Sequence, residues 1–210
     1  IQYSDKRRQF GPEGGSEVPI LNYRMHQRRL IPLLAKTYAI HFALQYVTNR
    51  YIDRSESEMP EIEALAAGMK AYSTWSTTDV LQVVHEAFGD KGYLSENIID
   101  TLKNDTEIYT TFEGDNTVLM QLVAKNRLSE FRKAFGEMDA MGIINYVFEN
   151  AKTAISEKNP IVTRKTEETH LLDYEFHLSA FQYREKTILA SAAKRLKKLI
   201  DGGLEPYDAF

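Results

Sequence analysis

One carboxylate, Glu113, stands out among the residues that could do chemistry. It lies between Phe112 and Gly114 in the stretch TTFEGDNT, directly before a run of strong helix formers. Asp115 or Asn116 can cap that helix, because a side-chain oxygen there accepts amide protons of the first turn. A carboxylate in this setting is either a surface residue of a loop or a general base whose pKa is raised by apolar neighbours. Spacing alone favours the surface interpretation.

The histidines do not predict a metal site. The pair His85-Glu86 lacks the second histidine of a zincin motif. His170 and His177 are separated by about 10 Å along one helix, too far to share an ion. Buried or solvated histidines are the better interpretation. No cysteine is present, which excludes a disulfide framework, a thiolate metal site and a cysteine nucleophile. No glycine-rich turn follows a strand, so neither a P-loop nor a Rossmann site is predicted.

Long helices must position Glu113. Apolar residues at helical spacing predict a core helix over residues 20–51, a second helix over 58–88 and a last helix over 171–200. The sequence also predicts a shorter helix capped by Ser95 and another helix that begins after Asp115. Lys36, His41 and Gln45 interrupt the first helix, so it is not a membrane span. Pro32 is expected near the start of the first helix or at a kink within it. Ser57 and Pro60 are expected to open the second helix, and Gly202-Gly203 to end the last one.

The expected fold is all-α, a bundle of long antiparallel helices, since no convincing period-two strand and no internal repeat is present. Gly136 and Gly142 suggest breaks in the helix that follows Asp115, and Asn159-Pro160 suggests a linker. The expected domains are residues 1–158, the helical bundle, and residues 159–210, the truncated start of a second helical domain. The chain opens on Ile1 rather than Met, so we expect a segment of a longer polypeptide.

Length, composition and net charge indicate a globular protein and argue against a nucleic-acid-binding one. A length of 210 residues with 43% hydrophobic and 27% charged residues is typical of a globular protein with a substantial core. The net charge of -4 argues against nucleic-acid binding, because no basic face dominates.

Four short motifs follow one another along the chain: Arg7-x-Gln9-Phe10-Gly11, His26-Gln27, Glu86-x-x-Gly89-x-x-Gly92-Tyr93 and Phe112-Glu113-Gly114. Taken singly, each of the first three has a simpler explanation as a solvated patch, a polar helix start or a helix-ending turn. Together, in this order and spacing, the four motifs resemble the C-terminal helical half of the acyl-CoA dehydrogenase superfamily, and the sequence around the last two is similar to the acyl-CoA oxidase branch. The resemblance is strong over residues 5–130 and extends into the last helix.

This resemblance implies a role for Glu113 as the catalytic base. In the family, a glutamate removes the α-proton of a fatty acyl-CoA while the β-hydrogen leaves as hydride to FAD, which gives a trans-2-enoyl-CoA. Burial beside Phe112 would help to provide the raised pKa and dry site that this reaction needs. Gly114 falls where the backbone passes close to the thioester end of the substrate. In the oxidase branch, O₂ reoxidises the flavin and forms H₂O₂.

The resemblance also implies an FAD site shared by two subunits of a homodimer. Glu86 stands where dehydrogenases usually carry glutamine, which supports the oxidase branch, whereas Phe88 and Asp90 replace small residues of the family's turn. The flavin ring and much of the acyl-CoA belong to family domains outside this chain. The residues that match cofactor-binding positions are Arg7, Gln9, Gln27, Glu86, Gly89, Asp90, Asp115 and Asn116.

Two other functions stay open at this point. One is a dehydrogenase that passes its electrons to an electron-transfer flavoprotein, and the other is a helical interaction module that has lost the chemistry. Because the oxidase and the dehydrogenase differ in the access of O₂ to the flavin, no residue of this chain separates them. The expected compartment is a bacterial cytoplasm, or a peroxisome for a eukaryotic source.

Overall fold

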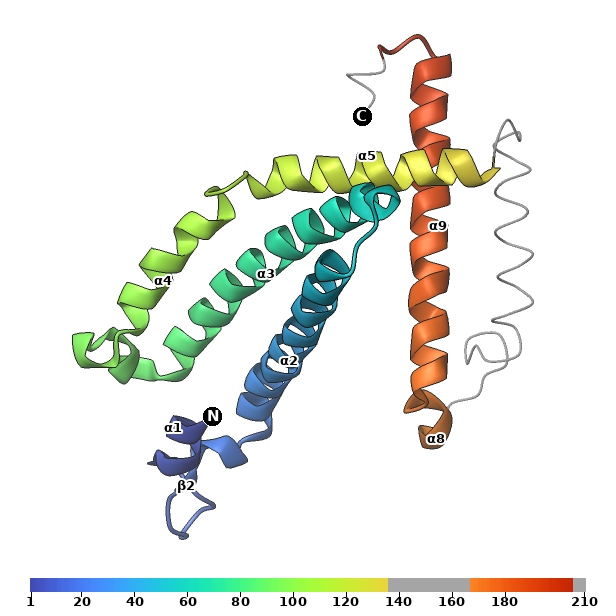
Figure 1. The fold of residues 1–210 in the computed structure, drawn as a ribbon. Helices are drawn as coiled ribbons and strands as arrows, with labels where there is room; N and C mark the ends of the chain where they lie inside the picture. The colour runs from blue at the N-terminus through green and yellow to red at the C-terminus, as the bar shows by residue number, and fades with distance from the viewer. Residues whose placement is uncertain (136–166, 206–210) are drawn as a thin grey trace. The chain divides into compact units, whose positions relative to one another are not determined.

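The computed structural model describes residues 1–135 and 167–205. The chain divides into two compact units, Ile1–Asn126 and Arg127–Phe210. The described residues are mostly helical (Figure 1), and their two strands are each two residues long. The all-α prediction is therefore confirmed. Within the described ranges, no helix is both long enough and apolar enough to cross a membrane.

The first unit begins with a small cap of short elements. Helix α1 (Gln2–Lys6) leads into strand β1 (Arg8–Gln9), which pairs antiparallel with β2 (Val18–Pro19). The 3-10 helix η1 (Ile20–Asn22) follows. The loop between the strands requires glycine at position 11, because a Cβ there would lie 2.0 Å from the backbone oxygen of Ser16.

Two long helices, α2 (Arg24–Ile52) and α3 (Met59–Ala87), run antiparallel and pack against each other (Figure 1). The bounds of α3 confirm the predicted second helix. Pro60 lies in its first turn, where the missing amide proton is least costly. Pro32 lies inside α2 rather than at its start.

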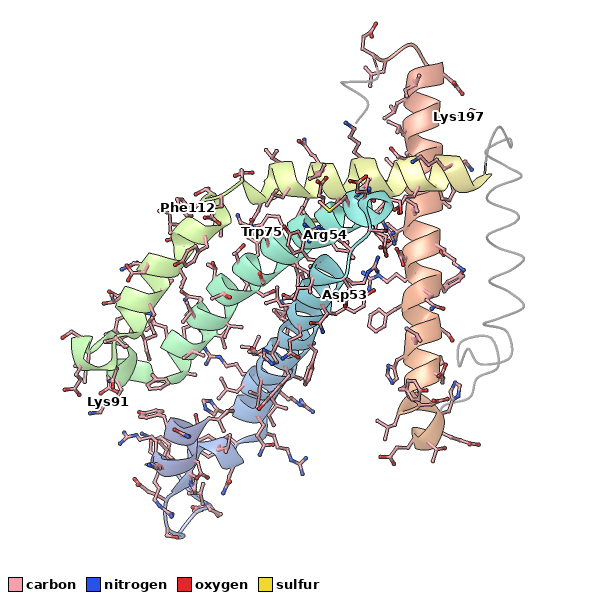
Figure 2. The ribbon with its side chains drawn as sticks, viewed as in Figure 1. Asp53, Arg54, Trp75, Lys91, Phe112 and Lys197 are labelled. Carbon is pink, nitrogen blue, oxygen red and sulfur yellow. The ribbon has the colours of Figure 1, made fainter. Side chains whose placement is uncertain are left out.

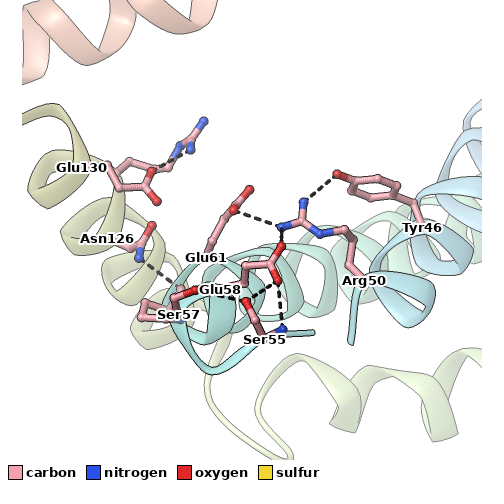
Figure 3. Close-up of polar contacts among 10 residues, drawn as sticks. Tyr46, Arg50, Ser55, Ser57, Glu58, Glu61, Asn126 and Glu130 are labelled. Atoms are coloured by element: carbon pink, nitrogen blue, oxygen red, sulfur yellow. Dashed lines mark hydrogen bonds and ion pairs between the residues drawn. The ribbon is translucent and has the colours of Figure 1, made fainter. Parts of the chain in front are cut away.

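The connection between these helices is held by polar contacts (Figure 3). Ser55 and Glu58 form a capping box around η2 (Glu56–Glu58), and the hydrogen bonds from Ser55 hold the pKa of Glu58 below its usual range. Arg50 near the end of α2 pairs with Glu58 at 3.3 Å and with Glu61 at 3.1 Å. Ser55 thus caps η2, and α3 has Glu58 at its N-cap position without a side-chain cap. The prediction that Ser57 opens the second helix was wrong, because the capping box needs a glutamate three residues after the serine.

A second pair of helices carries the predicted catalytic turn. The 3-10 helices η3 (Gly89–Tyr93) and η4 (Ser95–Asn97) lead to α4 (Ile99–Glu107), which packs on α3. Then η5 (Ile108–Thr110) and a turn lead to α5 (Asn116–Phe135). The predicted Ser95 cap was wrong: Ser95 opens η4 without a side-chain cap, and the left-handed Ile98, with φ 51°, separates η4 from α4.

The core of this unit centres on α3, whose small side chains let its neighbours approach closely. Its buried residues include Ile62, which is 2% exposed, and Ala71, which is fully buried. By contrast, the only buried residue of α2 is Leu30, while Tyr38 and Phe42 are 58% and 60% exposed. The prediction that residues 20–51 form a core helix was therefore wrong for the described chain, because α3 covers only one side of α2.

The described part of the second unit includes α8 (Glu168–Leu171) and α9 (Tyr174–Asp201). The Asp173 side chain caps α9 by accepting a hydrogen bond from the amide of Glu175 at 3.0 Å. The predicted last helix is thus divided near residue 172, and it ends before Gly202 as expected. The predicted breaks at Gly136 and Gly142, the linker at Asn159-Pro160 and the domain boundary after residue 158 lie outside the described residues.

Candidate functional site

The turn that carries Glu113 joins α4 to α5, and Figure 2 shows Phe112 at this junction. Glu113 has φ 54°, in the left-handed region, and the next residue, Gly114, has φ 111°. A non-glycine residue in that region costs about 1–3 kcal/mol and persists only where its surroundings enforce it. Such residues concentrate at active sites. Ile98 is the other non-glycine residue with positive φ in the described ranges.

Hydrogen bonds fix the turn on both sides of Glu113. Upstream, the amide of Phe112 donates to the carbonyl of Ile108 at 2.8 Å. Downstream, Asp115 Oδ1 accepts from the amides of Thr117 at 2.8 Å and Val118 at 3.3 Å. The prediction that Asp115 can cap the helix is confirmed. These are local contacts, typical of a helix start.

Longer-range contacts hold the turn against α3. Lys70 Nζ donates to the Gly114 carbonyl at 2.6 Å and to Asn116 Oδ1 at 2.9 Å. The Asn116 amide donates to Thr74 Oγ1 at 2.9 Å. Asn116 is 2% exposed, so its side chain is used inside the chain. Its predicted cofactor contact stays a prediction, and the observed contacts favour an internal role. Sequence reasoning missed Lys70 and Thr74, for which no local pattern gives a signal.

The expected apolar burial of Glu113 is not formed by the described chain alone. Glu113 is exposed, and its apolar neighbours Phe112, Tyr109 and Ile108 are 54%, 50% and 56% exposed. No described helix or loop covers the outer side of this turn. A dry environment therefore has to come from groups added to this surface.

Most of the predicted cofactor residues gather around the C-terminal end of α3. Tyr3 of α1 stacks on Phe88 with ring centroids 4.4 Å apart, and its hydroxyl donates to the Phe88 carbonyl at 3.4 Å. Arg29 of α2 forms an ion pair with Glu86. Ser4 Oγ lies 2.8 Å from His26 Nε2. These contacts bring α1, the start of α2 and the end of α3 together.

Within this cluster, the side chains differ in their availability to a ligand. Arg7 is exposed, and Gln9 and Gln27 are half-buried. Within the described ranges, the Arg7 guanidinium has no hydrogen bond or ion pair, so its donors are open to an anion such as a pyrophosphate. Glu86 is instead engaged by Arg29 and by Gln82, whose amide donates to it at 2.7 Å. Arg29 is a further residue that sequence reasoning did not assign to the site.

The glycine turn after α3 is needed for a close approach inside the chain. A Cβ on Gly92 would lie 2.4 Å from the carbonyl oxygen of His85. Gly89 has φ 60°, which favours glycine. Asp90 is exposed, and its side chain accepts a hydrogen bond from the amide of Lys91 at 3.0 Å. The predicted close approach is thus made to His85, which is 6% exposed and faces the Tyr93 ring.

Burial and the nearby Arg29 lower the pKa of His26, which favours its neutral form. This histidine directly precedes Gln27, so the cluster gains no positive charge from it near neutral pH. Across the parts of the chain that the structure describes, no three histidine, aspartate or glutamate side chains gather to form a metal site.

The two groups of predicted site residues are well separated. Lys70, which contacts the Glu113 turn, and Glu86, in the cofactor cluster, are about 24 Å apart along α3. Only Gly114, Asp115 and Asn116 share the turn of Glu113. The described chain therefore presents the predicted base beside the middle of α3 and most predicted cofactor residues at its C-terminal end.

Comparisons with known proteins agree on one family. Residues 1–128 match the family model "Acyl-CoA oxidase, C-alpha1 domain". Acyl-coenzyme A oxidase 2, peroxisomal, from Arabidopsis thaliana is 41% identical over 202 residues, which cover 94% of this chain and 29% of that protein. The chain thus spans under a third of the length of this relative.

Solved structures show the same fold. Arabidopsis thaliana acyl-CoA oxidase 1 has a TM-score of 0.80 at 28% identity, with coverage of 100% of this chain and 32% of that one. Acyl-CoA oxidase-1 of Caenorhabditis elegans, solved in complex with FAD and ATP, has a TM-score of 0.80 at 24% identity, with coverage of 99% and 31%. The family match, the sequence identity and the shared helical fold show that this chain belongs to the acyl-CoA oxidase family.

Proposed function

We propose that this chain supplies the catalytic base, Glu113, of an FAD-dependent acyl-CoA oxidase. The observation that carries this proposal is the left-handed conformation of Glu113, with φ 54°, held by hydrogen bonds on both sides. A surface loop under no functional constraint gains nothing from a strained glutamate, since glycine would fit the same backbone without cost.

The proposed reaction removes two hydrogens from a fatty acyl-CoA. The Glu113 carboxylate accepts the α-proton, the electrons of that C–H bond form the new Cα–Cβ double bond, and the β-hydrogen leaves with its electron pair. When bound, FAD would supply the hydride acceptor and a route for the two electrons to O₂, which would be reduced to H₂O₂. The products are a trans-2-enoyl-CoA and a protonated Glu113, which later releases its proton to solvent.

The residues beside Glu113 suit this role. The α-proton of a thioester is weakly acidic, so the base must be held in line with it and shielded from water. Gly114 adds no side chain next to the base, and glycine adopts its φ of 111° without steric strain. The substrate, or the protein surfaces around it, would cover the exposed Phe112 and supply the dry environment that the described chain lacks.

The cofactor cluster fits an FAD shared between two subunits, although the fit is partial. Arg7 and Gln9 offer open donors for a pyrophosphate, and Gln27 is half-buried near the start of α2. The Glu86 carboxylate, by contrast, is already paired with Arg29 and accepts a hydrogen bond from Gln82. Gly89 and Asp90 would contribute through their turn, and Asp115 and Asn116 beside the base. Separation of the two groups along α3 supports one FAD contact from each subunit of a homodimer.

The relatives support a peroxisomal compartment in preference to the bacterial cytoplasm that the sequence alone suggested. The Arabidopsis oxidase at 41% identity is named as peroxisomal. We extend that compartment to this chain.

Glu113→Gln in the full-length protein tests the base. Glutamine keeps the size and the backbone strain but cannot accept the proton, so we expect anaerobic flavin reduction by acyl-CoA to fall by about 10²- to 10⁴-fold. Glu107→Gln, an exposed glutamate at the end of α4, is the matched control and should reduce flavin at the wild-type rate. Near-normal flavin reduction by Glu113→Gln would refute the proposal that Glu113 is the base.

A second assay separates the oxidase from a dehydrogenase. Under air and without an added acceptor, the full-length protein should release one H₂O₂ for each enoyl-CoA formed. Enoyl-CoA formation that depends on an added electron-transfer flavoprotein, with no peroxide, would instead establish the dehydrogenase alternative.

A further inference from the structure

The ammonium group of Lys70 reaches the turn of the proposed base from a distant part of the sequence. Lys70 lies in α3 and is half-buried, and its Nζ donates to the Gly114 carbonyl at 2.6 Å and to Asn116 Oδ1 at 2.9 Å. Hydrogen bonds from a charged donor are shorter and about twice as strong as neutral ones. The two acceptors lie on either side of Asp115, so Lys70 spans the end of the turn.

The hydrogen bonds among Lys70, Asn116 and Thr74 form a closed ring against one turn of α3. The Asn116 amide donates to Thr74 Oγ1 at 2.9 Å and to the Ala71 carbonyl at 3.4 Å. The Thr74 hydroxyl lies 2.9 Å from the carbonyl of Lys70, to which it donates. Because Asn116 is 2% exposed, its polar atoms depend on these partners rather than on water. Loss of one member therefore leaves another unpaired.

The ring restrains a backbone that would otherwise relax. Glu113 and Gly114 have φ values of 54° and 111°, so two successive residues lie at positive φ. A return of Glu113 to the right-handed region would release its strain and redirect its side chain. The bond from Lys70 to the Gly114 carbonyl opposes this change, because it fixes the backbone one residue after the base.

We propose that Lys70 is a positioning residue for the oxidation of acyl-CoA. It acts through the Gly114 carbonyl and Asn116 to hold Glu113 in the conformation from which the carboxylate takes the α-proton. Lys70 itself does not touch the substrate. This inference rests on the proposed function of Glu113 and adds the group that orients it.

Lys70→Met in the full-length holoenzyme tests the proposal, since methionine keeps most of the apolar stem and removes the charge. We expect anaerobic flavin reduction by acyl-CoA to slow by about 10- to 100-fold, as for a misplaced catalytic group, with unchanged substrate affinity and FAD content. The kinetic isotope effect with α-deuterated substrate should rise, because proton removal becomes more rate-limiting. A change confined to thermal stability, with a normal reduction rate and isotope effect, would refute the positioning role.

Lys36→Met is the matched control. Lys36 is also half-buried and also contacts α3, where its ammonium lies 4.9 Å from the centre of the Tyr72 ring. Its ammonium lies over the Tyr72 ring and not at the Glu113 turn, so loss of its charge should leave flavin reduction and the isotope effect unchanged. An equal loss in both variants would show a general effect of removing charge at α3 and would overturn the proposal.

Thr74→Val removes the hydroxyl that bonds Asn116 and the Lys70 carbonyl in this ring, and it keeps the shape of the side chain. It should produce a smaller loss in the same direction and faster hydrogen exchange of the amides in residues 111–119, and it decides the question if Lys70→Met does not fold. Wild-type kinetics and exchange in Thr74→Val and Lys70→Met, with Glu113→Gln inactive, would refute only the role of Lys70. Normal flavin reduction in Glu113→Gln would instead refute the proposed function.

Discussion

Glu113→Gly should make the protein more stable while it abolishes the proposed chemistry. The reason is the backbone: Glu113 has φ 54°, in a region that an L-residue occupies at a cost of about 1–2 kcal/mol and glycine occupies freely. Glycine loses more chain entropy on folding, which offsets about 0.5–1 kcal/mol of this gain. Glu113 is exposed and makes no ion pair within the described ranges, so little else is lost. We expect a net stabilisation of about 0.5–1 kcal/mol.

The measurement is the free energy of unfolding in urea, with flavin reduction by acyl-CoA assayed on the same preparations. Glu107→Gly is the matched control, because it makes the same substitution at an exposed glutamate whose φ is -61°. There the glycine relieves no strain and should destabilise by about 0.5–1 kcal/mol. The two variants should therefore shift the urea midpoint in opposite directions.

Two results would refute this reasoning. If Glu113→Gly and Glu107→Gly destabilise the protein equally, the left-handed conformation of Glu113 is not a source of strain in solution. If Glu113→Gly is stabilised and still oxidises acyl-CoA at the wild-type rate, the strain is present but the carboxylate is not the base.

Two further predictions concern the cap of α5 and the pH dependence of stability. Asp115→Ala removes the acceptor of the Thr117 and Val118 amides and should lower the free energy of unfolding by about 1 kcal/mol; Asp115→Asn, which keeps a capping oxygen, should lose much less, and equal losses would contradict the capping role. For His26, burial and then Arg29 lower the folded-state pKa below the usual histidine value of 6.5, so the unfolded state binds the proton more readily. Stability is therefore fully present above about pH 6.5 and falls as the pH drops through the interval down to the folded-state pKa. Unfolding titrations from pH 8 to 5 should show a steeper acid loss in the wild type than in His26→Gln, and parallel curves would exclude His26 as the cause.

Local chemistry explains most of what could be predicted about the fold. The bounds of α3, the cap by Asp115 and the end of α9 before Gly202 all follow from contacts within a few residues. The failures at Ser57 and Ser95 have the same origin. Each serine is a plausible cap in isolation. Glu58, however, forms its capping box with Ser55, and α4 begins only after the left-handed Ile98.

The exposure of α2 could not be predicted from its own residues. Its apolar side chains indicate burial, but whether Tyr38 or Phe42 is covered depends on which element packs on that face. Within the described residues of this unit, α3 is the long helix that packs on α2. The same limit applies to Phe112 and Glu113, whose predicted dry setting needs more surface than the α4–α5 turn supplies.

By itself, the sequence determined the helical class, the capped start of α5 and, through the order of its motifs, Glu113 as the candidate base. Helix periodicity and capping are short-range effects, so they can be read along the chain. Only the tertiary structure decided that Glu113 is left-handed and that Lys70 and Asn116 hold its turn. Lys70 lies 44 positions before Gly114, and contacts over that separation exist only once α3 packs beside the turn.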